Sequence, residues 1–521
     1  MTITMAKLTE PASWPIPETD AGLFTLILAI RLANSLSINT FFQADEYWQA
    51  LEPAHYQIFG YGYLTWEWRQ GIRSFMHPLL YVPIYKVCQI LSLDYAYLLY
   101  LPKAMNALIC AVGETFQYKL TCKWTQDPSV RRAMFYLSLF SPFNWYCYCR
   151  SFSNSLELAL TTVALFLYPE TFGVHYIYSM AIAGLCCIIR PTNGLIWVVY
   201  GLRNFYRGPR LKIIISTILI GIAVLSVDLI VNRYFYGSWR IPYIKFLDFN
   251  VSKNLSSFYG VSRLDFYFLQ AIPVILLTYL PYFMIGLLVK KSRELKLVLI
   301  INLLVFSLIQ HKEFRFIYPM MPILLFFATH GMLYALRKLK PLTSSSLILF
   351  IALLNTAMAF YFTQIHESGV ITVTRYLRDE IGSSQSSIGF LTPCHSTPFQ
   401  SHFHLHPNQV DIWFLTCEPP LQLSSSSDLA TYRDESDEFY DDMPGFLQRN
   451  FPSLTADKSK DETKGPYPHT WPEYLVFFES LEQFMKEYLR NSSYSEHHRI
   501  FNSRFHWDSR RTGDVIIYKL N

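Results

Sequence analysis

The sequence predicts a mainly α-helical protein that crosses a membrane several times and ends in a small α+β domain. Composition is the first reason, since 51% of the 521 residues are hydrophobic and only 16% are charged. The second reason is that apolar runs near the ~20 residues needed to cross a bilayer recur along the chain, which the core of one soluble protein seldom contains. These runs lie at residues 21–38, 95–111, 133–148, 156–168, 213–231, 266–289, 295–309, 316–336 and 346–362.

We expect the run at 21–38 to be kept as a membrane span. A basic stretch does not precede it, and the residues from Ser37 to Thr40 do not form a small-residue cleavage site. The domain organisation that follows is a cytosolic segment at 1–20, a multi-spanning domain at 21–364 and a polar lumenal domain at 365–521.

Basic residues predict the orientation of the spans. Lysine and arginine gather in short connections, which marks the cytosolic side and explains the net charge of +5 without a nucleic-acid partner. The clusters are Lys119, Lys123, Arg131 and Arg132; Arg203, Arg207, Arg210 and Lys212; Lys290, Lys291, Arg293 and Lys296; and Arg337, Lys338 and Lys340. Residues 39–77, 150–155, the turn at Arg190, 232–265, 310–315 and the tail then face the other side, where sequons occur at Asn250, Asn254 and Asn491.

The tail from residue 365 has the features of a small folded domain. Residues 387–391 and 514–520 have the apolar pattern of strands. Cys394 and Cys417 lie on the non-cytosolic side and could pair in a disulfide. The acidic stretch 434–442 reads better as an exposed loop than as a metal site.

The loop at 39–77 contains the first candidate for chemistry. It carries Asp45 and Glu46, and carboxylates at the end of a span can act as a general base or hold a sugar hydroxyl, although solvated loop acids are the alternative. Apolar residues at Tyr47, Trp48 and Leu51 follow helical spacing, which predicts an amphipathic helix on the membrane surface.

A second candidate site lies at residues 311–316, between two apolar runs. His311, Lys312, Glu313 and Arg315 are polar residues close to hydrocarbon and need partners. Cationic side chains at a membrane boundary are what a phosphate attached to a lipid requires, and interfacial anchoring of a short loop is the alternative.

A third group contains Arg150, Asn154, Glu157 and Arg190. A spacing of three places Asn154 and Glu157 on one face of a helix, where they could contact a polar substrate or equally well join two helices by hydrogen bonds. Walker loops, glycine-rich dinucleotide fingerprints and zinc-binding spacings do not occur, so the sequence gives no reason to expect a nucleotide cofactor or a bound metal.

These residues resemble the family of lumenal GT-C mannosyltransferases that use dolichyl-phosphate mannose, in the branch with a His-Lys-Glu-x-Arg-Phe motif. That motif is complete at 311–316, and residues 42–55, 61–68, 236–239, 391–399 and 508–514 resemble the subfamily that builds the GPI anchor. One departure is Val261-Ser-Arg-Leu-Asp265, where the family has a His-Pro-Trp-His run, so an acceptor contact there is in doubt.

The resemblance implies a GT-C fold and an inverting α1,2-mannosyltransferase of the endoplasmic reticulum membrane. Its donor would be dolichyl-phosphate mannose and its acceptor the GPI precursor that receives a third mannose. Asp45 would be the base, with Glu46 as second choice or acceptor clamp. His311, Lys312 and Arg315 would meet the donor phosphate, with Arg150 and Arg190 behind them, and no metal would be required.

Three alternatives remain open at this point. A related transferase could act on the N-glycan precursor or add the fourth GPI mannose, because only the acceptor differs. A lipid or solute transporter is the alternative from another class, but its polar residues would lie at mid-span in paired broken helices.

Overall fold

The structure is a computed structural model that describes residues 16–253, 255–421, 431–454 and 467–521. Within these residues, six helical segments are long and apolar enough to cross a membrane. They are α1 (Asp20–Ser37), α5 (Tyr95–Trp124), α11 (Arg210–Tyr236), the segment Tyr267–Val289 that ends in α14 (Leu280–Val289), the segment Phe314–Leu336 that contains α16 (Met321–Leu336), and α17 (Pro341–Gln364), which is counted together with α18 (Gly369–Ile381).

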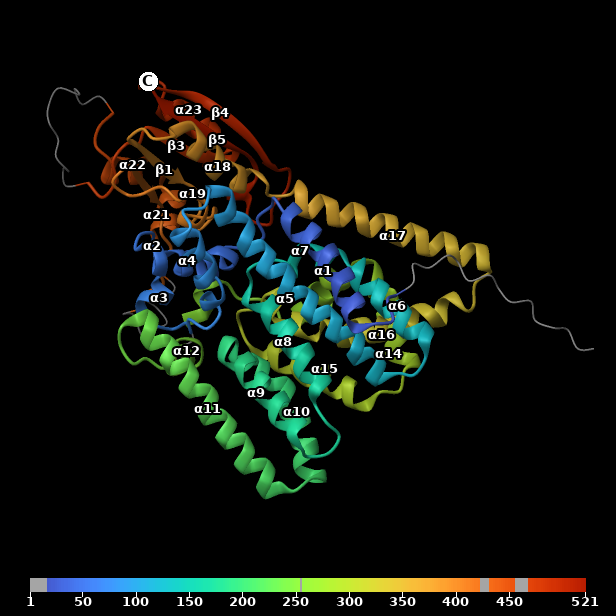
Figure 1. Cartoon of the computed structure of the whole chain (residues 1–521). Helices are drawn as coiled ribbons and strands as arrows, with labels where there is room; N and C mark the ends of the chain where they lie inside the picture. Colours follow the sequence, from blue (N-terminus) through green and yellow to red (C-terminus); the bar gives the residue numbers. More distant parts are fainter. Residues whose placement is uncertain (1–15, 254, 422–430, 455–466) are drawn as a thin grey trace, which may run out of the picture.

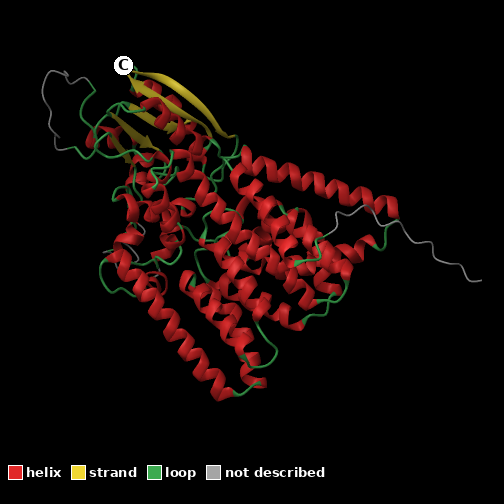
Figure 2. Ribbon diagram, in the orientation of Figure 1, coloured by secondary structure: helices red, strands yellow, loops and turns green. Residues whose placement is uncertain are grey.

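Shorter helices complete the bundle in Figures 1 and 2. They are α6 (Pro128–Leu139), α7 (Pro142–Cys147), α8 (Ser153–Leu167), α9 (Val174–Ile189), α10 (Gly194–Arg207) and α15 (Arg293–Leu308). The single run expected at 133–148 is therefore wrong. Pro142 lacks a backbone N–H and begins a second helix, and the Ser141 side chain caps it by accepting from the Asn144 N–H at 3.3 Å.

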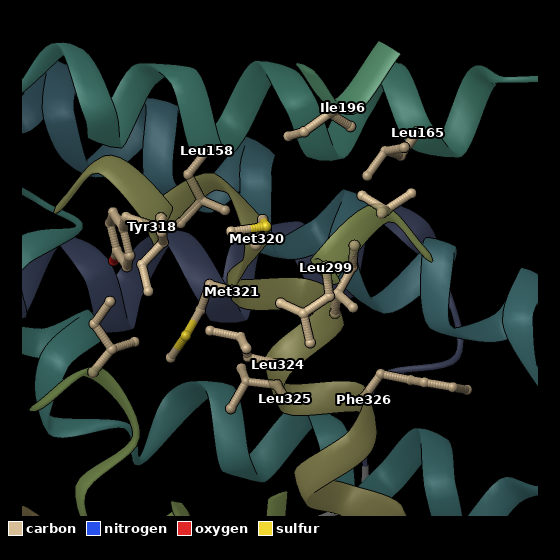
Figure 3. Close-up of a cluster of buried hydrophobic side chains, with 14 of the residues drawn as sticks. Leu158, Leu165, Ile196, Leu299, Tyr318, Met320, Met321, Leu324, Leu325 and Phe326 are labelled. Carbon is tan, nitrogen blue, oxygen red and sulfur yellow. The ribbon is translucent and has the colours of Figure 1, made fainter. Parts of the chain in front are cut away.

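The centre of the bundle is α16, whose side chains from Met321 to Thr329 are all buried. Figure 3 shows Met321, Leu324, Leu325 and Phe326 among side chains of α8, α10 and α15. Close packing against α14 depends on glycine, because a Cβ on Gly331 would collide with the backbone carbonyl oxygen of Tyr282. Small residues thus allow two helix backbones to touch inside the membrane domain.

A buried ion pair joins the first two long helices. The Arg31 guanidinium in α1 donates to both carboxylate oxygens of Glu114 in α5, at 2.7 Å from Nε and 2.5 Å from Nη2. Ser138 adds a hydrogen bond of 2.8 Å to the same carboxylate. Charges inside a membrane domain are tolerated when paired in this way.

The C-terminal domain contains a five-stranded mixed sheet in the order β2-β1-β3-β5-β4. Its strands are β1 (Ser386–Leu391), β2 (Val410–Phe414), β3 (Tyr474–Phe478), β4 (Tyr494–Ser503) and β5 (Gly513–Leu520), with β1 parallel to β2 and β3 and with β5 antiparallel to β3 and β4. β1 and β5 confirm the two strands predicted in the tail. The disulfide between Cys394 and Cys417 is formed.

Both faces of this sheet are covered. One face packs on α18 and α19 (Gln400–Phe403) and on the loop that follows α1, and the other on α21 (Glu435–Asp441), α22 (Met443–Asn450) and α23 (Glu482–Tyr488). The exposed loop expected at 434–442 is therefore wrong, because Asp434 caps α21 and Phe439 of this helix is buried in the core.

The first loop, residues 38–94 between α1 and α5, is folded against the protein. It contains a π-helical turn at Tyr47–Leu51, α2 (Glu52–Phe59), α3 (Trp66–Gln70) and α4 (Val82–Ile90). The spacing predicted that the apolar face at Tyr47, Trp48 and Leu51 lies on the membrane surface. This prediction is wrong, because the three side chains are buried in a core shared with the C-terminal domain. The Trp48 indole N–H donates to the Thr397 carbonyl at 3.0 Å.

Candidate active site

A cavity of about 1230 Å³ opens where the first loop, the membrane helices and the C-terminal domain meet. The first loop contributes Asp45 and Glu67, the helix ends contribute Arg190 and His311, and the C-terminal domain contributes His395 and Arg511. Residues of α3 and of α12 (Pro242–Leu247) also line this cavity, and both helices are labelled in Figure 1. Its walls therefore come from distant parts of the chain.

Asp45 lies on the cavity wall and is held by Arg315. One carboxylate oxygen of Asp45 is 2.5 Å from Nη2 of Arg315. The same guanidinium donates to Glu313 at 2.6 Å from Nε and 2.9 Å from Nη2, while its buried Nη1 has no hydrogen-bond partner in the described part of the chain. Arg315 thus bridges two carboxylates and keeps one donor for a further acceptor.

Glu46 points away from the cavity, although it is next to Asp45 in the sequence. Its carboxylate accepts from Nη1 of Arg150 at 2.9 Å, and burial raises its pKa while the Arg150 charge opposes that rise. Arg150 also donates to the Thr40 carbonyl at 2.6 Å, the Thr40 hydroxyl at 2.7 Å and the Tyr146 carbonyl at 2.5 Å. Among the described lining residues neither Glu46 nor Arg150 appears, and their contacts fix the start of the loop.

The motif at 311–316 divides in the same way. His311 and Glu313 both line the cavity, and Nε2 of His311 lies 3.2 Å from Oε1 of Glu313. Burial alone would lower the pKa of His311, but the hydrogen bond and charge of Glu313 outweigh it and raise that pKa. The Lys312 ammonium instead donates to the Ser262 carbonyl at 2.8 Å, and this lysine is absent from the described cavity lining.

Arg190 reaches the cavity from the turn between α9 and α10. Its Nε lies 3.4 Å from a Glu157 oxygen, and its guanidinium covers the Phe316 ring at 5.2 Å. Asn154 does not line the cavity in the described residues, but its amide donates to the Arg315 carbonyl at 3.1 Å and to Glu157 at 3.3 Å. Asn154 therefore holds the segment that carries Arg315 against α8.

Sequence reasoning did not select several residues of this cavity. Arg73 and Glu67 form an ion pair of 2.6 Å, and the Gln49 amide donates to Glu67 at 3.1 Å. His395 lies 4.4 Å from the Trp48 ring, and burial together with the Arg511 charge lowers its pKa to about 4, against the effect of Asp45. The sequence signal for Gln49, Glu67, His395 and Arg511 was the resemblance at 42–55, 61–68, 391–399 and 508–514, and Arg73 lies outside these segments.

Arginine side chains and carboxylates both line the cavity, and this combination can hold a phosphate group next to a carboxylate. Arg73 and Arg315 each line the cavity beside a carboxylate that also lines it, whereas Glu157, the acidic partner of Arg190, is absent from the described lining. Within the described residues one group has metal-ligand spacing, namely Cys394, His395 and Cys417. Its two sulfurs are joined in the disulfide, so they do not offer thiolate ligands.

Comparison with known proteins shows the family of this chain. The model of the Alg9-like mannosyltransferase family matches residues 22–404, which include Asp45, Arg315 and His395. The chain belongs to this family. It is therefore a membrane-embedded mannosyltransferase, which excludes the transporter alternative.

Relatives of this mannosyltransferase match over nearly its whole length. GPI mannosyltransferase 3 of Candida albicans is 45% identical, over 96% of this chain and 98% of the relative. GPI mannosyltransferase 3 of Debaryomyces hansenii is 44% identical, over 95% and 91%, and GPI alpha-1,2-mannosyltransferase 3 of Mus musculus is 35% identical, over 95% and 87%. The crystal structure of ArnT from Cupriavidus metallidurans bound to undecaprenyl phosphate matches with a TM-score of 0.56 at 12% identity, over 96% of this chain and 97% of that one, which shows the GT-C fold.

Proposed function

We propose that this mannosyltransferase adds the third mannose, in α1,2 linkage, to the GPI-anchor precursor, with dolichyl-phosphate mannose as donor. The active site faces the lumen of the endoplasmic reticulum. The names of the relatives in two yeasts and in mouse support the acceptor. The observation that carries the chemistry is the contact between Asp45 and Arg315, which places a carboxylate and a cation at one point of the cavity.

Asp45 is the base in this proposal. Its carboxylate accepts the proton of the acceptor hydroxyl while the hydroxyl oxygen attacks the anomeric carbon of the donor mannose. The bond between that carbon and the phosphate oxygen breaks, and dolichyl phosphate leaves with the electron pair. Attack from the face opposite the phosphate turns a β-linked donor into an α-linked product.

The leaving phosphate is stabilised by cations. Arg315 offers its unpartnered Nη1, and Arg190 and His311 line the same cavity. A dolichyl phosphate monoester is stable as an anion, so the step needs neither a general acid nor a metal. Phosphate binding at Arg315 also competes with Asp45 for the guanidinium, which frees the carboxylate to take the proton.

Asp45→Asn is the test. Microsomes from cells that lack the endogenous enzyme would receive the variant, labelled dolichyl-phosphate mannose and the acceptor with two mannoses. We expect transfer to fall by roughly 10²–10⁴-fold, the usual contribution of a general base, at an unchanged protein level. Asp411→Asn is the matched control, because Asp411 is exposed on β2 and absent from the described cavity lining.

Two results would contradict the proposal. Normal transfer by Asp45→Asn at equal protein level would remove Asp45 from the base position. Accumulation of a precursor other than the two-mannose species in depleted cells would reassign the acceptor to the fourth-mannose or N-glycan pathway.

A further inference from the structure

The loop between β4 and β5, residues 504–512, brings the end of the chain into the catalytic cavity. His506, Trp507 and Arg511 of this loop line it together with Asp45 and Trp48 of the first loop. Trp507 is 89% exposed although it stands at the cavity. A large apolar ring with so little protein contact is available to a ligand.

Arg511 has donor capacity that the protein does not use. Its side chain is 20% exposed, and Nη2 donates to the Cys394 carbonyl at 3.1 Å. Its buried Nε has no hydrogen-bond partner among the residues that the structure describes, since the nearest Asp508 oxygen is 3.6 Å away. A buried N–H of this kind gains from an acceptor supplied by a bound molecule.

His395 links this loop to the reacting groups. Its backbone φ is +54°, in the left-handed region that non-glycine residues seldom adopt, and the neighbouring Cys394 is tied to Cys417. The imidazole lies against Trp48 with the two rings tilted by 47°, and the charges of both Asp45 and Arg511 act on it. The C-terminal domain is thus held next to the base.

We infer that Trp507, Arg511 and His395 form the subsite for a neutral hexose of the acceptor glycan. The ring of Trp507 offers a surface for the C–H face of a sugar, while arginine and a neutral imidazole offer hydrogen-bonding groups for its hydroxyls. The cavity of about 1230 Å³ exceeds the ~300–1,000 Å³ typical of a pocket for one drug-sized ligand, so it has room for acceptor sugars beside the donor mannose. This inference rests on the proposed function.

Separate titration of the two substrates tests the subsite. Trp507→Ala is the main variant, because a side chain that is 89% exposed can be removed without loss of the fold. We expect the KM for the two-mannose acceptor to rise roughly three- to tenfold, the loss of about one interaction, with the KM for the donor unchanged. Trp507→Phe keeps a ring and restores most of the acceptor affinity, and Arg511→Gln shifts the same constant.

Phe501→Ala is the matched control, since Phe501 is an aromatic residue of β4 that is 43% exposed and absent from the described cavity lining. An acceptor KM that stays unchanged in Trp507→Ala, or a donor KM that rises equally, would overturn the inference. Trp507→Ala should have the same effect on the KM for a soluble acceptor glycan that lacks the lipid phosphate. If the effect disappears with the phosphate, the loop binds the phosphate and not the sugar. If the wild-type enzyme itself ignores the two-mannose acceptor, the proposed function fails instead.

Discussion

Replacement of Glu46 by alanine distinguishes the role of Glu46 from that of the neighbouring Asp45. The change leaves the Arg150 guanidinium, whose side chain has 0% exposure, without its carboxylate partner. Breaking a buried pair on one side costs ~3–5 kcal/mol. Arg150 keeps three oxygen acceptors from Thr40 and Tyr146, so we expect the lower end, about 3 kcal/mol.

Thermal unfolding of the purified enzyme in detergent measures this loss. An unfolding entropy of ~2.1 cal/mol/K per residue amounts to ~1.1 kcal/mol/K for 521 residues, so the midpoint should fall by about 3 °C. Transfer at low temperature, per folded molecule, should stay within roughly tenfold of the wild type, unlike the loss expected for Asp45→Asn. Glu46→Gln keeps an oxygen acceptor for Arg150 and should lose less.

The opposite pattern would refute this reasoning. An unchanged midpoint together with a loss of transfer as large as that of Asp45→Asn would make Glu46 the base. It would also mean that the ion pair with Arg150 does not make Glu46 a structural residue.

Four further predictions follow from particular contacts. Arg315→Ala should raise the KM for the donor more than that for the acceptor, because Arg315 lies beside Asp45 and is the residue that we propose binds the leaving phosphate; an effect confined to the acceptor would remove it from that role. Cys394→Ser should lower the free energy of unfolding by about 2–4 kcal/mol, because the disulfide closes a loop with a sequence separation of 23. Chemical denaturation measures this loss, Cys417→Ser should show the same loss, and equal stability of the reduced and oxidised wild type would contradict the prediction. Burial raises the pKa of Glu52 from 4.5 to about 7, so its stabilising contribution is fully present below 4.5 and is lost as pH rises through about 7; the midpoint should fall over this window, and a Glu52→Gln variant with an equally steep fall would reassign the effect. The exposed Asn491 should carry an N-glycan, seen as an endoglycosidase shift that Asn491→Gln abolishes, whereas the Asn250 amide donates to the Phe246 carbonyl at 2.8 Å beside the cavity and should stay bare; Asn254 lies outside the described residues.

The sequence predicted the parts of the site that depend on short stretches of chain. Asp45 follows one apolar run and Arg315 precedes another on the same predicted side, so topology predicts that both face the same compartment, and the structure shows that they are in contact. The roles of Asp45 and Glu46 could not be separated, because the turn that sends one to the cavity and the other to Arg150 is set by tertiary contacts. The same applies to the face of Trp48, since helical spacing shows an apolar side but not whether lipid or protein covers it.

The subsite in the tail was beyond sequence reasoning for a different reason. Trp507 and Arg511 reach the cavity only because the sheet pairs β4 with β5 and the first loop packs on its other elements. Polar residues in a tail have no periodic pattern that predicts such a contact. The break at Pro142 is the converse case, because a local rule would have located it.

The folding of the first loop onto the C-terminal domain also has a consequence for biosynthesis. Trp48 is made early, and Trp507, which lines the same cavity, is made 459 residues later. At ~5–20 residues per second, roughly 25–90 s separate the synthesis of the two residues. The membrane spans and Asp45 are therefore synthesised before the loop 504–512, which completes the lining of the cavity. A premature stop before Trp507 would give a membrane protein that lacks this part of the lining. The proposed acceptor subsite is therefore complete only when translation is nearly finished.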